Sequence, residues 1–235
     1  FMDEARGFAV FCMIFYHAFY TMAFMYGLPW GETLLFFFKP AEPFFAALFI
    51  FISGISSDLS HSNLIRGLKL LGVALGVTLV TAVVVPDEII VFGVLHMLAV
   101  CMILFGLAKP FFQKLPVWPS LAVLSFLLLL TWNLQNGFLG IQPFSVAIPQ
   151  SLTSIKGLYP FGLTDGTLFS ADYFPLFPWL FVFLGGTFLG RFAAAGKFPA
   201  FTYKSRVPFF SWMGRHALIL YIVHQPVIYG ILWLL

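Results

Sequence analysis

Long apolar stretches separated by short polar, Gly-containing or Pro-containing breaks make up almost the whole chain. A membrane-spanning helix needs about 20 predominantly apolar residues, and several stretches reach that length. The second stretch is interrupted by the sequence Lys39-Pro-Ala-Glu42-Pro43. The predicted crossings are residues 5–26, the broken pair 34–38 and 44–55, and residues 68–85, 89–108, 117–134, 176–194 and 209–235. The pattern therefore predicts an all-α fold, a polytopic membrane helix bundle with about seven transmembrane helices.

The longest break between crossings covers residues 137–174 and is rich in Gly, Pro, Ser and Thr. Because this segment is too long for a simple tether, we expect a loop that caps one mouth of the bundle. Seven crossings and short loops account for nearly all of the 235 residues, which leaves no room for a separate soluble domain. We therefore expect residues 1–235 to form a single membrane-embedded domain.

The amino-acid composition also indicates a membrane environment. Hydrophobic residues make up 61% of the chain and charged residues 9%, against about 45–50% and about 25% in soluble domains. The lipid bilayer is therefore the expected surrounding of an integral membrane protein. The net charge of +3 is small and dispersed, so nucleic acid is not an expected partner. Composition leaves open whether the chain forms a homo-oligomer.

Basic residues divide unequally between the two sides of the predicted crossings. Ten lie on the side of the N-terminus, and only Lys39 and Lys156 lie on the other side. Because cytoplasmic loops carry an excess of Lys and Arg, this division predicts a cytoplasmic N-terminus and an extracytoplasmic capping loop. Acidic residues such as Asp165 and Asp172 gather on the outer side. We expect the cytoplasmic mouth to suit an anionic ligand and the outer mouth a polar or cationic one.

The first crossing carries three residues whose side chains could take part in binding or catalysis: Asp3, Arg6 and His17. Arg6 and His17 are eleven positions apart, which in a helix corresponds to about 16 Å along the axis and a return to within about 20° of the same direction. One face of this helix therefore links its polar mouth to the middle of the bilayer. Asp3 lies one turn from Arg6 and is expected to hold its guanidinium.

Three histidines are predicted inside crossings: His17, His96, which lies about seven residues into the fourth crossing, and His224. Ionisable residues inside a membrane are costly and usually functional. The alternative for a single histidine is a structural hydrogen bond to a neighbouring carbonyl. The chain contains no His-Glu-x-x-His motif, so we expect no metal site.

A row of serines at the end of the second crossing has two interpretations. Ser53, Ser56, Ser57 and Ser60 recur at helical spacing, which is typical of a hydrogen-bonded helix seam. Alternatively, Ser53 and Gly54 let a ligand approach the backbone, with Arg66 and Lys69 beyond them for phosphates. The pairs Gly72/Gly76 and Gly186/Gly190 are expected to allow close helix packing.

Together these motifs resemble those of two groups of membrane acyltransferases. Arg6 and His17, separated by ten residues, resemble the signature of the acyltransferase-3 family. The fuller arrangement is similar to that of the heparan-alpha-glucosaminide N-acetyltransferase catalytic-domain-like family of bacterial membrane proteins. The matching elements are Asp3-x-x-Arg6-Gly7, His17, Phe51-Ile-Ser53-Gly54-Ile-Ser56, Arg66-Gly67, Phe92-Gly93-Val-Leu-His96, Tyr173-Phe-Pro175-Leu-Phe-Pro178-Trp179 and His224-Gln-Pro226.

This resemblance implies an acetyl-CoA-dependent O- or N-acyltransferase of the bacterial cytoplasmic membrane. The acyl group would pass from acetyl-CoA on the cytoplasmic side to a hydroxyl or amine of a glycan, amino sugar or lipid. The family pattern has a histidine in the loop after the first crossing, but residues 28–32 contain none. His17 is therefore the expected catalytic histidine.

Each candidate residue has an expected role in this reaction. His17 would be the general base or the carrier of the acyl group, because an imidazole buried in apolar surroundings stays neutral and can accept a proton. Arg6, held by Asp3, would bind the donor's phosphate or pantetheine end, and His96 and His224 would orient the acceptor or stabilise the oxyanion. The expected acetyl-CoA contacts are Arg6, Ser53, Gly54, Ser57, Arg66 and Lys69. Two other functions stay open: a proton-coupled transporter of small solutes, and a non-catalytic membrane subunit.

Overall fold

The computed structural model describes residues 1–234, and helices dominate it as the hydrophobic pattern predicts. In this part of the chain, six segments are long and apolar enough to cross a membrane. They are Met2–Met25, Pro29–Asp58, Asn63–Val84, Val94–Phe112, Val117–Asn136 and Leu176–Ala194. A seventh exists if the bent pair Pro208–Arg215 and Ala217–Trp233 counts as one crossing. The predicted all-α membrane protein is confirmed.

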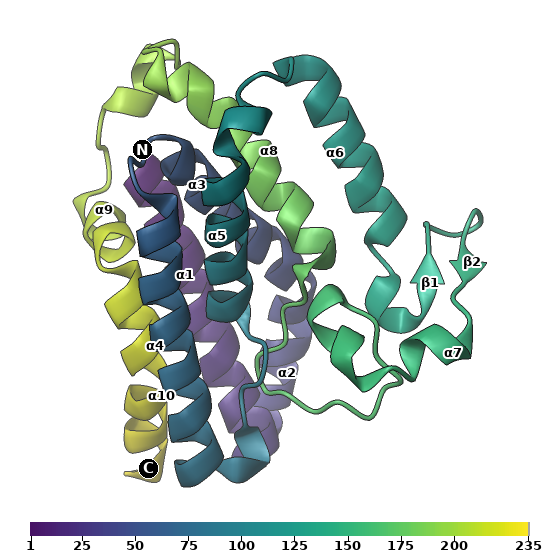
Figure 1. Ribbon diagram of the computed structural model, residues 1–235. Helices are drawn as coiled ribbons and strands as arrows, with labels where there is room; N and C mark the ends of the chain where they lie inside the picture. Colours follow the sequence, from purple (N-terminus) through teal and green to yellow (C-terminus); the bar gives the residue numbers. More distant parts are fainter. Residues whose placement is uncertain (235) are drawn as a thin grey trace. The chain divides into compact units, whose positions relative to one another are not determined.

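Contacts within the chain define two compact units, whose helices and strands are labelled in Figure 1. The first unit contains Phe1–Ile52 and Lys197–Leu235. Its elements are α1 (Met2–Tyr20), a π-helical turn (Thr21–Met25), α2 (Pro29–Phe38), a 3-10 turn (Lys39–Ala41), the first part of α3 (Glu42–Asp58), a 3-10 turn (Ala200–Tyr203), α9 (Pro208–Arg215) and α10 (Ala217–Trp233). The predicted break in the second crossing is the 3-10 turn between α2 and α3.

The backbones of α1 and α9 lie in direct contact. A Cβ atom placed on Gly7 would lie 1.9 Å from the carbonyl oxygen of Phe210, and one on Gly214 would lie 1.9 Å from that of Asp3. Buried Glu4 adds a polar link, because its carboxylate accepts hydrogen bonds from the backbone N–H groups of Arg206 and Val207 at the start of α9. Glycine is therefore required at both contact points.

The last predicted crossing, residues 209–235, is two helices joined at a bend, and its final residue lies outside the part that the structure describes. Helices α9 and α10 meet at 90°. His216 lies between them outside helical geometry, and its ring Nδ1 donates to the carbonyl of Trp212 at 2.9 Å. The backbone N–H of His216 donates to the same carbonyl at 3.2 Å, so the end of α9 is capped by both the backbone and the ring of His216.

The second unit contains Ser53–Gly196. Its elements are the end of α3, α4 (Asn63–Val84), a 3-10 turn (Pro86–Glu88), α5 (Val94–Phe112), α6 (Val117–Thr131), a 3-10 turn (Leu134–Asn136), β1 (Phe138–Leu139), β2 (Val146–Ala147), α7 (Gln150–Thr153), a 3-10 segment (Lys156–Phe161) and α8 (Leu176–Ala194). The two strands form a small antiparallel hairpin. Residues 137–174 thus contain short ordered elements.

Glycines bring α3 and α8 together in this unit. A Cβ on Gly54 would lie 2.0 Å from the carbonyl oxygen of Phe183, and one on Gly190 would lie 2.7 Å from the Cβ of Asp58. Close packing at Gly186/Gly190 is confirmed. The same expectation for Gly72/Gly76 is wrong, because none of residues 1–234 comes within 4 Å of a Cβ built on either glycine.

Two crossings begin at positions other than those predicted. Helix α4 starts at Asn63 rather than residue 68, so Arg66 and Lys69 belong to its first two turns. Helix α5 starts at Val94 rather than Ile89, because residues 89–92 pair with the other end of the long connection. The N–H of Ala171 donates to Ile89 at 3.0 Å, and that of Phe174 donates to Phe92 at 2.9 Å. His96 is therefore in the first turn of its helix and not seven residues deep.

The glycine contacts lead to a test of helix packing. Gly54→Ala should lower the free energy of unfolding by about 2 kcal/mol or more, because the new methyl group overlaps a backbone oxygen and overpacking typically costs about 1–3 kcal/mol. Gly76→Ala is the matched control: the site is open and alanine favours helix, so stability should stay equal or rise. Thermal unfolding in detergent measures both, and equal behaviour of the two variants would contradict the α3–α8 contact.

Candidate functional site

A polar centre lies in the first unit where α1 meets α10. We call His17, Thr21, His224 and Gln225 the α1 centre. The amide nitrogen of Gln225 lies 3.3 Å from His17 Nδ1, and Thr21 donates to the amide oxygen at 3.4 Å. The rings of His17 and His224 lie 5.0 Å apart between centroids. The structure thus brings together two of the three histidines selected from sequence.

The hydrogen bonds of the α1 centre assign the ring protons. Nδ1 of His224 lies 2.6 Å from the carbonyl of Tyr221, which can only accept, so this nitrogen carries a proton. In the neutral ring the lone pair is then on Nε2. Nδ1 of His17 faces a donating amide, so the neutral ring of His17 carries its proton on Nε2. In this pair, Nε2 of His224 can accept a proton and Nε2–H of His17 can donate a hydrogen bond.

A π-helical turn begins directly after this part of α1, at Thr21. Such turns often occur at functional sites because they displace side chains from regular helical positions. Here the turn contains Thr21, which is fully buried and bonds Gln225. The π-helical turn therefore contributes one of the residues of the α1 centre.

Arg6 and Asp3 lie near the start of α1, as predicted. Arg6 donates to the Asp3 carboxylate at 3.0 Å, which makes the expected ion pair, and to the carbonyl of Gly214 at 3.5 Å. Helix α1 is continuous from Met2 to Tyr20, so no break separates Arg6 from His17. The two residues therefore lie on the same side of one regular helix, as predicted. About 16 Å of helix separates the two residues.

A second polar centre lies at the start of α5 and contains His96, Thr78 and Asp172. Thr78 donates its only hydroxyl proton to the carbonyl of Ile90 at 2.7 Å, so it must accept from His96 Nε2, 3.2 Å away. The lone pair of the neutral His96 ring is then on Nδ1. This atom is buried and has no hydrogen-bond partner among residues 1–234. It is a ready acceptor for a hydroxyl or amine.

Asp172 caps α5 and was not among the site residues selected from sequence. Its carboxylate is buried and accepts from the N–H of Val94 at 3.1 Å. A Cβ on Gly93 would lie 2.4 Å from the same oxygen, so glycine is needed beside the carboxylate. A carboxylate at a helix N-terminus is favourable both as a cap and through the helix dipole. Sequence offered no signal for this role, because the two segments are 78 residues apart.

Tyr173 follows this cap and holds the connection in place. Its hydroxyl donates to the carbonyl of Tyr159 at 2.6 Å. Burial, with a smaller contribution from Tyr159, raises the pKa of Tyr173 to about 12. The phenol therefore stays protonated, and keeps donating, across the physiological pH range.

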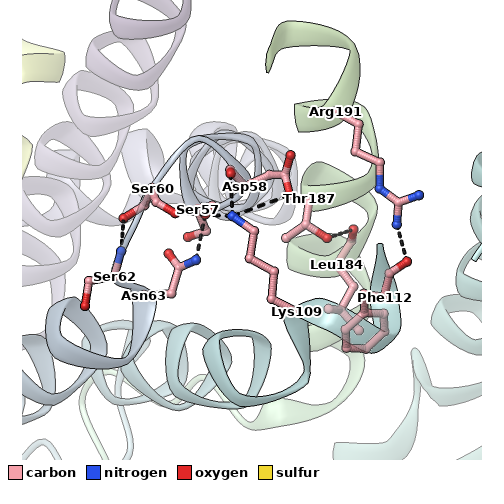
Figure 2. A network of polar contacts seen from close by, with 10 residues as sticks. All are labelled: Ser57, Asp58, Ser60, Ser62, Asn63, Lys109, Phe112, Leu184, Thr187 and Arg191. Atoms are coloured by element: carbon pink, nitrogen blue, oxygen red, sulfur yellow. Dashed lines mark hydrogen bonds and ion pairs between the residues drawn. The ribbon is translucent and has the colours of Figure 1, made fainter. Parts of the chain in front are cut away.

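A third polar cluster surrounds the end of α3, where Figure 2 shows two basic side chains at helix ends. Lys109 donates to the carbonyl oxygens of Asp58 at 2.7 Å and Ser60 at 3.2 Å, and its amine lies 4.0 Å from the Asp58 carboxylate. Arg191 donates to the carbonyl of Phe112, the last residue of α5, and to that of Leu115 beyond it, the latter at 2.8 Å. Both cations satisfy carbonyls that a helix end leaves unpaired.

Of the predicted donor-site residues, Ser57 belongs to this cluster, and Arg66 and Lys69 follow it on α4. Ser53 and Ser57 are buried on α3, whereas Arg66 and Lys69 are exposed on α4. Ser57 Oγ and Asn63 Oδ1 are buried atoms without a hydrogen-bond partner in the part of the chain that the structure describes. Gly54 faces the backbone of α8 and so has a packing role; its contact with a ligand stays a prediction.

Metal ligands do not cluster in these centres. No group of three or more His, Cys, Asp or Glu side chains is placed to hold a metal ion within residues 1–234.

The capping role of Arg191 can be tested by mutation, with a nearby lysine, Lys114, as the control position. Arg191→Met should lower stability by about 2 kcal/mol or more, because hydrogen bonds to a charged group contribute about 1.5–3 kcal/mol and the carbonyls would lose their partner. Arg191→Lys should be intermediate, since an ammonium lacks the planar fork. Lys114→Met, at an exposed position near the same helix end, should change the melting temperature little. If Lys114→Met lowered the melting temperature as much as Arg191→Met, the effect would come from the loss of a positive charge and not from the loss of the cap.

Comparison with known proteins identifies the group to which the chain belongs. Comparisons with curated proteins and with solved structures gave no significant match. A family model described as "Heparan-alpha-glucosaminide N-acetyltransferase, catalytic" matches residues 1–226. This range contains both histidines of the α1 centre, the Asp172 cap and the basic residues around α3. The resemblance to this family is thus confirmed, and the chain belongs to the heparan-alpha-glucosaminide N-acetyltransferase catalytic family of membrane acetyltransferases.

Proposed function

We propose that this protein transfers an acetyl or similar acyl group from acetyl-CoA, bound from the cytoplasmic side, to a hydroxyl or amine of a glycan, amino sugar or lipid. Family membership supports acetyl transfer. The observation that carries the proposal is the pair of imidazoles at 5.0 Å in the α1 centre. In helices that are otherwise largely apolar, such a pair is costly unless it serves a reaction.

The two rings divide the chemical work. Acyl transfer needs a base for the acceptor's proton and a donor for the oxyanion. His224, whose Nδ1–H is held by the Tyr221 carbonyl, offers a lone pair at Nε2 and acts as the base. His17, whose Nδ1 accepts from Gln225, offers Nε2–H to the oxyanion. Sequence alone nominated His17 as the base; these hydrogen bonds favour His224 for that step.

The reaction then balances without any further reactant. The acceptor's oxygen or nitrogen attacks the thioester carbonyl carbon, and its proton passes to Nε2 of His224. The carbonyl oxygen gains negative charge and is stabilised by Nε2–H of His17. When the tetrahedral intermediate collapses, the carbon–sulfur bond breaks and the leaving thiolate takes the proton from His224. The products are the acylated acceptor and free coenzyme A.

Arg6 is proposed to hold the phosphate end of the donor. The length of α1 between Arg6 and His17, about 16 Å, is one that an extended phosphopantetheine arm can bridge. Ser57, Arg66 and Lys69 belong to the second unit, and their contact with the anionic donor stays a prediction from sequence. His96 belongs to the second unit, and its expected role in orienting the acceptor stays a prediction from sequence.

The first test is release of free thiol from acetyl-CoA by the purified protein with a glucosamine or glycan acceptor. His17→Ala and His224→Ala should each lower the rate by about 10²–10⁴-fold, the usual contribution of a positioned acid or base. His61→Ala removes an exposed histidine outside both centres and should leave the rate unchanged. Equal rates for all four proteins would remove the histidine pair from the mechanism.

The second test asks which tautomer His17 needs. Gln225→Met removes the amide donor at nearly constant volume and should lower the rate about tenfold, equivalent to one hydrogen bond of about 1.4 kcal/mol. Gln225→Glu replaces the donor with an acceptor, draws the ring proton to Nδ1 and removes the Nε2–H donor, so it should be slower still. A Gln225→Glu enzyme faster than Gln225→Met would instead make His17 the base. Thermal unfolding of both variants checks that they fold.

A further inference from the structure

The hairpin that follows α6 carries an exposed apolar surface that the proposed function does not use. Its strands pair Phe138 with Ala147 and Leu139 with Val146. Four large apolar side chains of the hairpin are exposed: Phe138 at 42%, Ile141 at 42%, Phe144 at 88% and Val146 at 68%. Since neighbouring strand positions point to opposite faces, Phe138 and Val146 expose apolar side chains on both faces of the hairpin. Exposed apolar side chains gathered in this way fit contact with an apolar medium.

The sequence around the hairpin lacks charge altogether. No Asp, Glu, Lys, Arg or His occurs between residues 115 and 155, a range that covers α6, the hairpin and α7. A loop that faces water normally carries mixed charges on its surface. A neutral segment with aromatic and aliphatic tips instead fits the boundary between lipid headgroups and acyl chains.

Hydrogen bonds fold the hairpin back along α6. The N–H of Gly140 donates to the carbonyl of Leu130 at 2.6 Å, and the side chain of Asn133 donates to the carbonyl of Gly140 at 3.0 Å. Figure 1 shows β1 and β2 beside the end of α6. Gly140 is thus fixed next to a residue of the last turn of α6, within the candidate crossing Val117–Asn136, and the tip lies beyond it.

Trp132 marks the level of this contact relative to the membrane. Tryptophan concentrates at membrane–water interfaces, and Trp132 is exposed at the end of α6. Leu130 lies two residues before it, which is about 3 Å further into the crossing. The tip of the hairpin therefore starts at or below the level of the interface.

The backbone at the tip is also suited to an apolar medium. The N–H of Phe144 donates to Ile141 at 2.8 Å, that of Ile148 donates to Gly137 at 2.8 Å, and Pro143 has no N–H. Polar backbone groups in or near hydrocarbon must be satisfied within the protein, and these bonds reduce the number that would face lipid.

We propose that hairpin 138–147 inserts into the bilayer leaflet at which α6 ends, with Ile141 and Phe144 among the upper acyl chains. It is a second, non-spanning membrane anchor. It ties the long connection to the membrane surface, so that only its later part, from Lys156 onward, meets water as a cap.

The test is the depth of a nitroxide label in proteoliposomes. Phe144→Cys is labelled in a Cys12→Ala background, which leaves Cys101 buried and unreactive. Power saturation compares collisions with oxygen, which concentrates in lipid, and with a water-soluble nickel complex. Phe126→Cys, on the exposed face of α6, is the lipid reference, and Lys156→Cys is the water reference.

The proposal predicts that the label at position 144 behaves as at position 126, with an oxygen accessibility severalfold above that for nickel. Nickel accessibility like that at position 156 would overturn it. Shielding from both reagents would also overturn it, because the hairpin would then be covered by a protein partner or a second copy. Phe144→Trp supplies a measurement without labels: brominated lipids should quench its added fluorescence, and no added quenching would contradict insertion.

Discussion

Polar groups inside apolar helices must find their partners within the protein, because lipid offers none. The three polar clusters of this chain satisfy that constraint in different ways. Gln225 meets His17, the N-terminus of α5 meets Asp172, and Lys109 meets carbonyls at the end of α3. Each contact joins segments that are distant in sequence. The same bonds that satisfy polar groups therefore also join the helices that pack together.

Close helix contact supplies the geometry in which those bonds can form. Gly7 and Gly214 let the backbones of α1 and α9 touch, and Arg6 reaches the carbonyl of Gly214 across that contact. In the second unit, Gly54 and Gly190 do the same for α3 and α8. Since lipid provides no hydrophobic force between helices, such small residues have a large share in helix association. At the ends of these helices, the close packing that glycine permits also brings polar side chains within hydrogen-bonding distance of the neighbouring helix.

The sequence predicted much of this fold because its main signal is local. Hydrophobic length predicted the crossings, and helical periodicity predicted the Asp3–Arg6 contact. What it missed depends on long-range pairing. The start of α5 was misplaced because residues 89–92 bond a segment about 80 positions away. The bend between α9 and α10 was missed as well, because nothing in the apolar pattern marks the non-helical backbone at His216. Gly72/Gly76 shows that a packing motif does not determine whether a partner lies beside it.

The central claim is that one imidazole of the α1 centre donates and the other accepts. Nitrogen NMR of the protein with labelled histidine, assigned with His17 and His224 variants, reports which ring nitrogen carries each proton. The account predicts a neutral His17 protonated at Nε2 and a neutral His224 protonated at Nδ1, with the His17 signals moving in Gln225→Met. The reverse assignment, or His17 signals that do not respond to Gln225→Met, would contradict it.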